Sequence, residues 1–174
     1  TDCDITQRAK KGIAYAFQQP VRFKGITIQE LLELAAGKEL SYTELCDLLG
    51  KVGLCAREYI NRELDSGLSG GEMKRVEIAS VLARNAKVTI FDEPEAGIDL
   101  WSFTKLVETF QELRSRQNGL LLIISHQERI LEIADEIVVI AKGKIRTVGS
   151  KDEVLPQLLS GEISKKCPRG KENQ

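Results

Sequence analysis

The second half of the chain alternates strand-like and helix-like segments, and this alternation limits its fold more than any other feature. Val88–Phe91 and Leu120–Ile124 are short, mainly apolar runs with the length of buried strands. The helix predicted between them, which Asn118-Gly119 should end, has one apolar face. That face is formed by Phe103, Leu106, Val107, Phe110 and Leu113. Because strands that are apolar on both faces and alternate with helices are typical of parallel sheets, the sequence predicts an α/β fold with a largely parallel sheet.

Further elements are predicted on both sides of this region. Before it come a strand at Ile13–Phe17 and two helices, whose N-termini are marked by capping boxes at residues 27–30 and 41–44. Glycines at positions 37 and 50 should end these helices. After it the predicted elements are a helix at 127–134, a strand at 137–141, a turn at 142–143, a strand at 144–148 and a helix capped by Ser150 and Glu153.

Composition excludes several classes of function. The chain has 42% hydrophobic and 29% charged residues, and its longest apolar runs have strand length, so no membrane span is predicted. The formal net charge of −1 predicts no basic surface, and nucleic acid is not expected as a partner. The cysteines are scattered, without a C-x-x-C motif, which indicates the reduced thiols of a cytoplasmic protein rather than a zinc site. They are Cys3, Cys46, Cys55 and Cys167.

The most specific motif is Leu68-Ser69-Gly70-Gly71-Glu72, which is followed by Met73-Lys74-Arg75. Two glycines at a helix start allow close approach of an anion, and the unpaired N–H groups of the first turn point at it. Ser69 adds a hydroxyl donor. A plain capping box between Ser69 and Glu72 is the alternative explanation of the motif.

A second motif, Val88–Pro94, is a strand that ends in the adjacent carboxylates of Asp92 and Glu93. Ligands of α/β sheets bind at the carboxyl ends of the strands. One carboxylate can hold Mg²⁺ while its neighbour polarises an attacking water. An isolated D-E-P sequence would more simply end a strand in solvent, but here the motif follows Ser69–Glu72 by one helix length, which favours a site.

A single histidine, His126, follows the strand that ends at Ile124-Ser125. A lone histidine is more often a packed or surface residue than a catalytic one. At the carboxyl end of a strand next to Asp92 and Glu93, however, it could hydrogen-bond a terminal phosphate.

Together these motifs resemble the ATP-binding cassette (ABC-type) ATPases, from Ile13 to about Gly149. The matching segments are Gln18 for the Q-loop, Leu68–Glu72 for the signature, Val88–Glu93 for the Walker B strand, Ala96–Asp99 for the D-loop and Ser125-His126 for the switch histidine. The resemblance implies a P-loop NTPase (RecA-like) core, truncated at its N-terminus, with a helical subdomain. The implied parts are the end of a first core lobe at 1–20, the helical subdomain at 21–85, the RecA-like core at 86–150 and a C-terminal helix and tail at 151–174.

The resemblance also implies ATP and Mg²⁺ as cofactors, with hydrolysis at the interface of a head-to-tail homodimer. Glu93 would be the general base, and His126 would hold the attacking water and the γ-phosphate. Asp92 and Gln18 would bind the metal. The implied nucleotide-binding residues are Gln18, Ser69, Gly70, Gly71, Glu72 and Asp99.

Within the family, Ser69–Glu72 followed by Lys74-Arg75 is similar to the iron–sulfur cluster assembly ATPase of the Suf system, because most transporter subunits have Gln where this chain has Glu72. The segment Asp92–Asp99 departs from the serine-rich version common in that subfamily. The Suf resemblance implies that the helical subdomain binds a scaffold protein. Two alternatives are an ABC transporter subunit that docks on a membrane permease and a non-catalytic interaction module.

The printed 174 residues contain no G-x-x-x-x-G-K-[ST] motif, the P-loop whose N–H groups and lysine hold the β- and γ-phosphates. We therefore expect these residues alone to bind ATP very weakly or not at all, and submicromolar MgATP binding in a calorimeter would contradict this. An incomplete sheet would also expose apolar edges through which the chain could self-associate.

Overall fold

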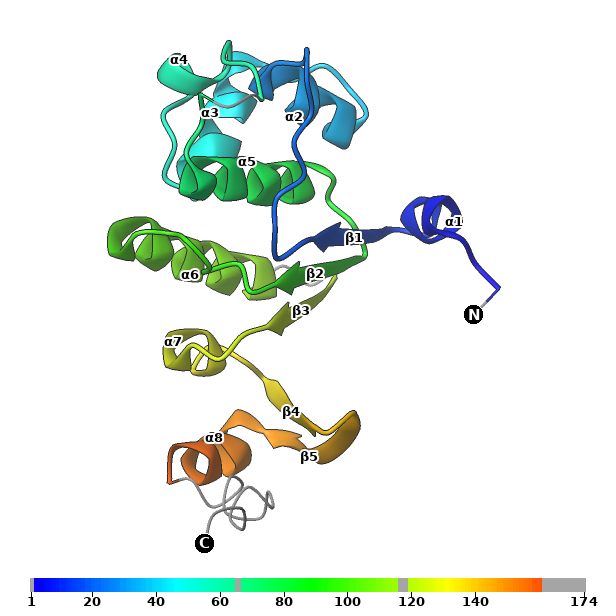
Figure 1. Cartoon of the computed structure of the whole chain (residues 1–174), viewed down its shortest axis with the longest axis vertical. Coiled ribbons are helices and arrows are strands. Elements are labelled where there is room, and N and C mark those ends of the chain that lie inside the picture. Colours follow the sequence, from blue (N-terminus) through cyan, green and yellow to red (C-terminus); the bar gives the residue numbers. More distant parts are fainter. Residues whose placement is uncertain (1, 65–66, 116–118, 161–174) are drawn as a thin grey trace, which may run out of the picture. The chain divides into compact units, whose positions relative to one another are not determined.

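The computed structural model describes residues 2–64, 67–115 and 119–160, which form two compact units divided between Ser125 and His126. The elements of the first unit are α1 (Ile5–Lys10), β1 (Ile13–Ala16), α2 (Ile28–Ala36), α3 (Tyr42–Lys51), α4 (Ala56–Tyr59), α5 (Gly70–Ala83), β2 (Val88–Asp92), α6 (Leu100–Ser115) and β3 (Leu120–Ile124) (Figure 1). Those of the second are α7 (Glu128–Leu131), β4 (Glu136–Ala141), β5 (Lys144–Ser150) and α8 (Lys151–Leu159).

The first unit is built on a parallel sheet with the strand order β1-β2-β3. The helix α6 connects β2 to β3, which is the crossover that two parallel neighbours require. The predicted parallel sheet is thus confirmed. Strand β1 ends at Ala16, one residue before the predicted end, and β2 runs one residue further than predicted, to Asp92.

One face of this sheet is covered by helices, and the other is open among the described residues. The buried Phe91 of β2 packs against Phe110 of α6 with ring centroids 5.0 Å apart. Ala16, which pairs with Phe91 in register, is also buried, and α5 contacts β1. On the opposite face Leu120 is 60% and Leu122 43% exposed. The apolar surface left open is therefore a face of the sheet as well as an edge.

The capping boxes predicted at residues 27–30, 41–44 and 69–72 are all present. In each box a Ser or Thr hydroxyl accepts from the N–H group of the glutamate, and the glutamate accepts from the N–H group of the cap residue. Gly37 ends α2 with a φ of 69°, a conformation that favours glycine. Helix α3 continues past the predicted stop by one residue, to Lys51.

Two helices of the first unit were not predicted. Helix α1 begins with a capping box between Asp4 and Gln7, and this spacing of residue types is visible in the sequence. The short helix α4 has no side-chain cap, and the sequence gives little sign of it.

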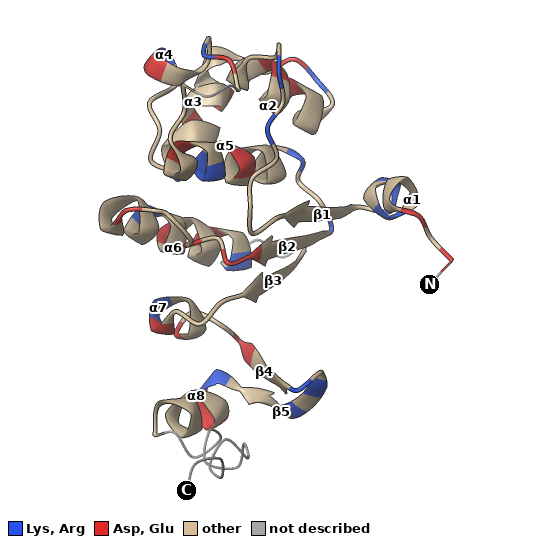
Figure 2. Cartoon of the chain, in the orientation of Figure 1, with Lys and Arg blue, Asp and Glu red and all other residues tan. Residues whose placement is uncertain are grey.

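Helices α2 and α3 pack against α5, and α3 also contacts α4. Their buried apolar residues include Ile28, Leu32, Leu45, Leu49, Ala56, Val76 and Ile78. Figure 2 shows that acidic and basic residues are interspersed along these helices. The four-part division of the chain stays a prediction.

The second unit contains an antiparallel hairpin of β4 and β5. Its turn is the predicted Lys142-Gly143, and both residues have positive φ angles, 51° and 70°, as a tight hairpin requires. Helix α7 is shorter than the predicted helix at 127–134, whereas α8 has the predicted cap of Ser150 and Glu153. The tail expected to be frayed, 165–174, lies outside the described residues. Among the described helices, none combines the length and the hydropathy that crossing a membrane needs.

Candidate functional site

Adjacent carboxylates lie at the carboxyl end of β2. Asp92 is the last residue of the strand, and Glu93 follows it with a φ of 43°. This left-handed conformation is uncommon for residues other than glycine, costs on the order of 1–3 kcal/mol and is found often at functional sites. The Glu93 N–H group donates to the carbonyl of Ile124 at 2.9 Å. The end of β3 therefore holds Glu93 in its strained conformation.

Side chains from β1 and the segment after it reach both carboxylates. The Tyr15 hydroxyl donates to Oδ2 of Asp92 at 2.8 Å, and this hydrogen bond raises the pKa of Tyr15. Gln18 donates from Nε2 to Oε2 of Glu93 at 2.5 Å. The structure thus brings together three of the predicted site residues, Gln18, Asp92 and Glu93.

Two charged residues of α5 hold the backbone around Gln18. The side chain of Lys74 is 1% exposed, and burial lowers its pKa. Its Nζ donates to the carbonyls of Phe17, Gln18 and Asp92, the last two at 3.1 and 3.4 Å. Glu77 accepts from the Phe17 N–H group at 3.2 Å, and burial raises the pKa of its carboxyl group. Through Lys74 and Glu77, helix α5, which begins with the 69–72 motif, is thus attached to the segment that carries Gln18.

The signature turn, residues 69–72, begins α5. Ser69 Oγ accepts from the Glu72 N–H group at 3.2 Å, and Glu72 Oε2 accepts from the Ser69 N–H group at 2.7 Å. The capping box considered as the alternative explanation of the motif is therefore present. It leaves the N–H groups of Gly70 and Gly71 without a partner inside the helix, since first-turn donors have none. Because Ser69 and Gly70 are exposed, the turn can also serve as an anion site.

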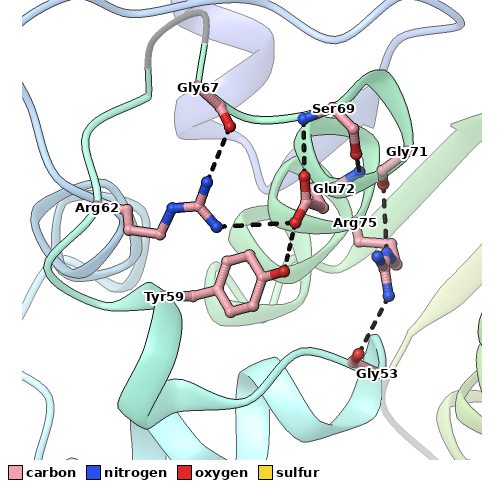
Figure 3. A network of polar contacts seen from close by, with 8 residues as sticks. All are labelled: Gly53, Tyr59, Arg62, Gly67, Ser69, Gly71, Glu72 and Arg75. Atoms are coloured by element: carbon pink, nitrogen blue, oxygen red, sulfur yellow. Dashed lines mark hydrogen bonds and ion pairs between the residues drawn. The ribbon is translucent and has the colours of Figure 1, made fainter.

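The carboxylate of Glu72 is the centre of a polar network (Figure 3). It accepts a hydrogen bond from the Tyr59 hydroxyl and forms an ion pair with Arg62 at 3.7 Å. The hydrogen bond from Tyr59 is the largest cause that lowers the pKa of Glu72, to about 2. Arg62 also donates to the carbonyl of Gly67 at 2.9 Å and lies 4.9 Å from the centre of the Tyr59 ring. This network holds Gly67, which precedes the signature turn, and Glu72 of the turn to the segment that carries Tyr59 and Arg62.

The loop at residues 96–99 lies against the signature turn. A Cβ atom on Gly71 would lie 2.6 Å from the carbonyl oxygen of Gly97, so only glycine fits at position 71. Asp99 Oδ1 accepts from the Ser102 N–H group at 2.9 Å, and this backbone hydrogen bond lowers the pKa of Asp99. The predicted residues Gly71 and Asp99 are thus parts of one surface of the first unit.

His126 is exposed and is the first residue of the second unit, so its predicted catalytic role stays a prediction. The residue before it, Ser125, donates from Oγ to Oε1 of Glu95 at 2.5 Å. This hydrogen bond holds Ser125, the last residue of the first unit, to the segment that follows Glu93.

The residues around Asp92 suit Mg²⁺ only when a nucleotide brings further ligands. Among the described residues no group of three or more His, Cys, Asp or Glu side chains could hold a metal ion alone. Asp92 uses one carboxylate oxygen for Tyr15, and Gln18 uses its amide nitrogen for Glu93, which leaves an oxygen donor on each. Mg²⁺ commonly takes one or two such protein ligands together with phosphate oxygens. The donor set therefore fits MgATP better than free Mg²⁺.

Several residues that shape this site were not among the predicted site residues. They are Tyr15, Tyr59, Arg62, Lys74 and Glu77. For Lys74 a signal exists, because it lies within a helix whose apolar residues occur on every side. A charged residue in such a helix must find partners in the protein interior.

Known proteins of similar sequence are ATP-binding proteins of transporters. The model of the ABC transporter family matches residues 1–96. An uncharacterized ABC transporter ATP-binding protein of Methanocaldococcus jannaschii is 35% identical, over 98% of this chain and 71% of its own length. The energy-coupling factor transporter ATP-binding protein EcfA2 of Bacillus subtilis is 32% identical, over 89% of this chain and 56% of its own length. This chain thus spans only part of each relative.

Solved structures share the fold. The ATP-binding subunit of an ABC transporter matches with a TM-score of 0.75, over 92% of this chain and 69% of that chain, at 24% identity. A dimeric, post-hydrolysis ATP-binding cassette with bound ADP and Pi matches with a TM-score of 0.73, over 86% of this chain and 68% of that chain, at 22% identity. These likenesses show the α/β fold of the ABC cassettes, the P-loop NTPase fold expected from the sequence. The chain belongs to the ABC transporter ATP-binding family, whose members are ATPases.

Proposed function

We propose that the complete protein hydrolyses MgATP, with Glu93 as the general base. The observation that carries this proposal is the 2.5 Å hydrogen bond between Gln18 and Glu93 at the carboxyl end of β2. In this hydrogen bond the Gln18 amide nitrogen contacts the carboxylate of Glu93, whose backbone is strained and which directly follows Asp92. A base for water and oxygen ligands for Mg²⁺ are the two groups that in-line attack on a γ-phosphate needs from this side.

In this mechanism Glu93 takes a proton from the attacking water while Gln18 keeps the carboxylate in place. Asp92 and the Gln18 oxygen would hold Mg²⁺, which neutralises charge on the phosphates when the nucleotide is bound. Lys74 keeps the backbone of Gln18 and Asp92 at a fixed separation through its hydrogen bonds to both carbonyls. His126 would position the water and the γ-phosphate.

We further propose that two copies share each site, head to tail. The exposed Ser69 hydroxyl and the N–H groups of Gly70 and Gly71 would then bind the terminal phosphate held by the other copy. Glu72 would keep this turn in shape through its bond with Tyr59. The dimeric cassette of the same fold that contains ADP and Pi supports this arrangement.

For the partner, we propose a membrane permease that docks on the helical subdomain, residues 21–85, from the cytoplasm. The names of the two relatives above, both ATP-binding proteins of transporters, support it. A second candidate is a Suf-type scaffold protein for iron–sulfur cluster assembly. The observation that favours this candidate is Glu72, which forms an ion pair with Arg62. Most transporter subunits have Gln at this position.

The catalytic proposal is tested with Glu93→Gln in the complete gene product. Losing the base should lower kcat by roughly 10²- to 10⁴-fold, while ATP binding persists and the ATP-bound dimer accumulates in size-exclusion chromatography. Glu108→Gln is the matched control, because Glu108 lies exposed on α6 and should leave kcat unchanged. An unchanged kcat in Glu93→Gln would refute the mechanism.

The partner is tested by affinity purification of the tagged complete protein from the membrane and soluble fractions of its own cells. Recovery of an integral membrane permease supports the first candidate. Recovery of a soluble scaffold protein that carries or builds an iron–sulfur cluster, without a permease, supports the second. Loss of the recovered protein after substitution of exposed residues between α2 and α4 would place its docking site on the helical subdomain.

A further inference from the structure

The guanidinium group of Arg75 has acceptors on three segments of the first unit, and Figure 3 shows its contacts with Gly53 and Gly71. Its Nη1 donates to the carbonyl of Gly53 at 3.1 Å and to Oγ of Ser102 at 2.8 Å. Its Nε donates to the carbonyl of Gly71 at 3.4 Å. These acceptors belong to the loop between α3 and α4, to the first turn of α6 and to the signature turn. Gly71 lies one turn before Arg75 on α5 itself, so this side chain connects the start of α5 to the other two segments.

The connection continues from Ser102 to the loop at residues 96–99. The Ser102 hydroxyl, which is buried, accepts from Arg75, and the Ser102 N–H group donates to Asp99. On the other side Arg75 binds Gly71, whose backbone is already in tight contact with Gly97. Because even a Cβ atom on Gly71 would collide with the Gly97 carbonyl, we expect a shift of the signature turn to move the 96–99 loop as well.

The remaining acceptor, Gly53, connects this pair to the helical segment. Gly53 has a φ of 72°, and a Cβ atom at this position would lie 3.6 Å from both Arg75 Nη1 and Ser102 Oγ. The loop is thus built closely around the guanidinium group. Gly53 lies in the loop that joins α3 to α4. A movement of these two helices would therefore shift Arg75 and, with it, the signature turn and the 96–99 loop.

We propose that Arg75 is a positioning residue that sets the signature turn relative to the 96–99 loop and couples both to the helical segment. This inference rests on the proposed function, in which both elements serve a site shared between two copies. The planar guanidinium group carries five N–H donors in fixed directions, which suits three acceptors on different segments. A lysine ammonium group at the end of its flexible chain keeps the charge but not this geometry.

The test is the ATPase activity of the complete gene product with Arg75→Met, Arg75→Lys and Ser102→Ala. Displacement of groups near a reacting phosphate lowers kcat, so both Arg75 variants should lose roughly 10- to 100-fold in kcat with a nearly unchanged KM for ATP. Ser102→Ala should lose less, because Arg75 keeps its contacts with Gly53 and Gly71. The double variant Arg75→Met/Ser102→Ala should resemble Arg75→Met alone, because the Ser102 hydroxyl acts through its contact with Arg75. Thermal melting of each variant separates this loss from unfolding.

Arg84→Met is the matched control. Arg84 follows the other end of α5 and donates to the carbonyl of Ala9 at 2.8 Å, away from the signature turn. Its kcat should equal that of the wild type. Full activity in Arg75→Met or complete rescue by Arg75→Lys would overturn the inference. If Arg75→Met does not fold, an unchanged kcat in Ser102→Ala overturns it. A wild-type protein that hydrolyses no ATP would refute the proposed function instead, so the two failures are distinct.

Discussion

Replacement of Lys74 by Met should strongly destabilise the first unit. The Lys74 side chain is 1% exposed, and that of Glu77 is 12% exposed. Lys74 Nζ forms an ion pair with Glu77 Oε2 at 3.8 Å. Removing one partner of a buried pair leaves the other charge uncompensated and costs about 3–5 kcal/mol. For a chain of this size that corresponds to a fall in Tm of about 6–20 °C.

The same substitution should change how stability depends on pH. Burial raises the pKa of Glu77 in the folded protein, so the folded state binds more protons than the unfolded state between the unfolded and the folded pKa. Stability therefore falls as the pH rises through this window. Lys74 lowers the pKa of Glu77, so without it the folded pKa rises further. The pH range over which stability falls should therefore extend to higher pH in Lys74→Met than in the wild type.

Thermal unfolding followed by circular dichroism between pH 5 and 8 measures both effects. The matched control is Lys105→Met, which breaks an exposed pair with Glu108 at 3.0 Å, with side chains 46% and 54% exposed. Such surface pairs contribute about 0–1 kcal/mol. The double variant Lys74→Met/Glu77→Gln should recover part of the loss. A Tm of Lys74→Met equal to that of the control would refute the reasoning.

Other substitutions test the signature turn and the open sheet face. Gly71→Ala should cost about 1–3 kcal/mol because its methyl group meets the carbonyl of Gly97 at 2.6 Å, whereas Gly70→Ala, with open space around it, should not; urea titration compares them. Glu72→Gln should cost about 1–3 kcal/mol at pH 7. The folded pKa of Glu72, about 2, lies below its usual value of 4.5, so the stabilisation is lost as the pH falls through this range, and the two proteins should converge in acid melts. Leu122→Lys should reduce self-association of the 174-residue chain in sedimentation velocity, because Leu122 is an exposed apolar residue of the sheet face; equal association would place the contact elsewhere.

The local elements of this fold are predictable because their causes lie within a few residues. A capping box needs a hydroxyl and a carboxylate three positions apart, and the boxes at 27–30, 41–44 and 69–72 form as their spacing predicts. The apolar runs become the strands β2 and β3, and alternation with helices makes the sheet parallel. The short helix α4, which lacks a cap, has no comparable signal and was missed.

The candidate site could be predicted as a set of residues but not as a geometry. The motifs pointed to Gln18, Asp92 and Glu93 separately, and only folding places Gln18 against Glu93, 75 positions away. The same holds for Lys74, whose partners lie 57, 56 and 18 positions from it. Such contacts depend on the register of β1 and β2 and on the packing of α5, which no local pattern contains.

The sequence by itself determined the family, the parallel α/β class and the helix start at Ser69, because each follows from residue types at short, fixed spacings. The tertiary structure decided how these parts act together. It showed that Glu72 binds Tyr59, that Gly71 must be glycine because of Gly97, and that Arg75 joins three segments. The physical reason is that hydrogen bonding and close packing between distant segments are satisfied only once the chain has folded around them.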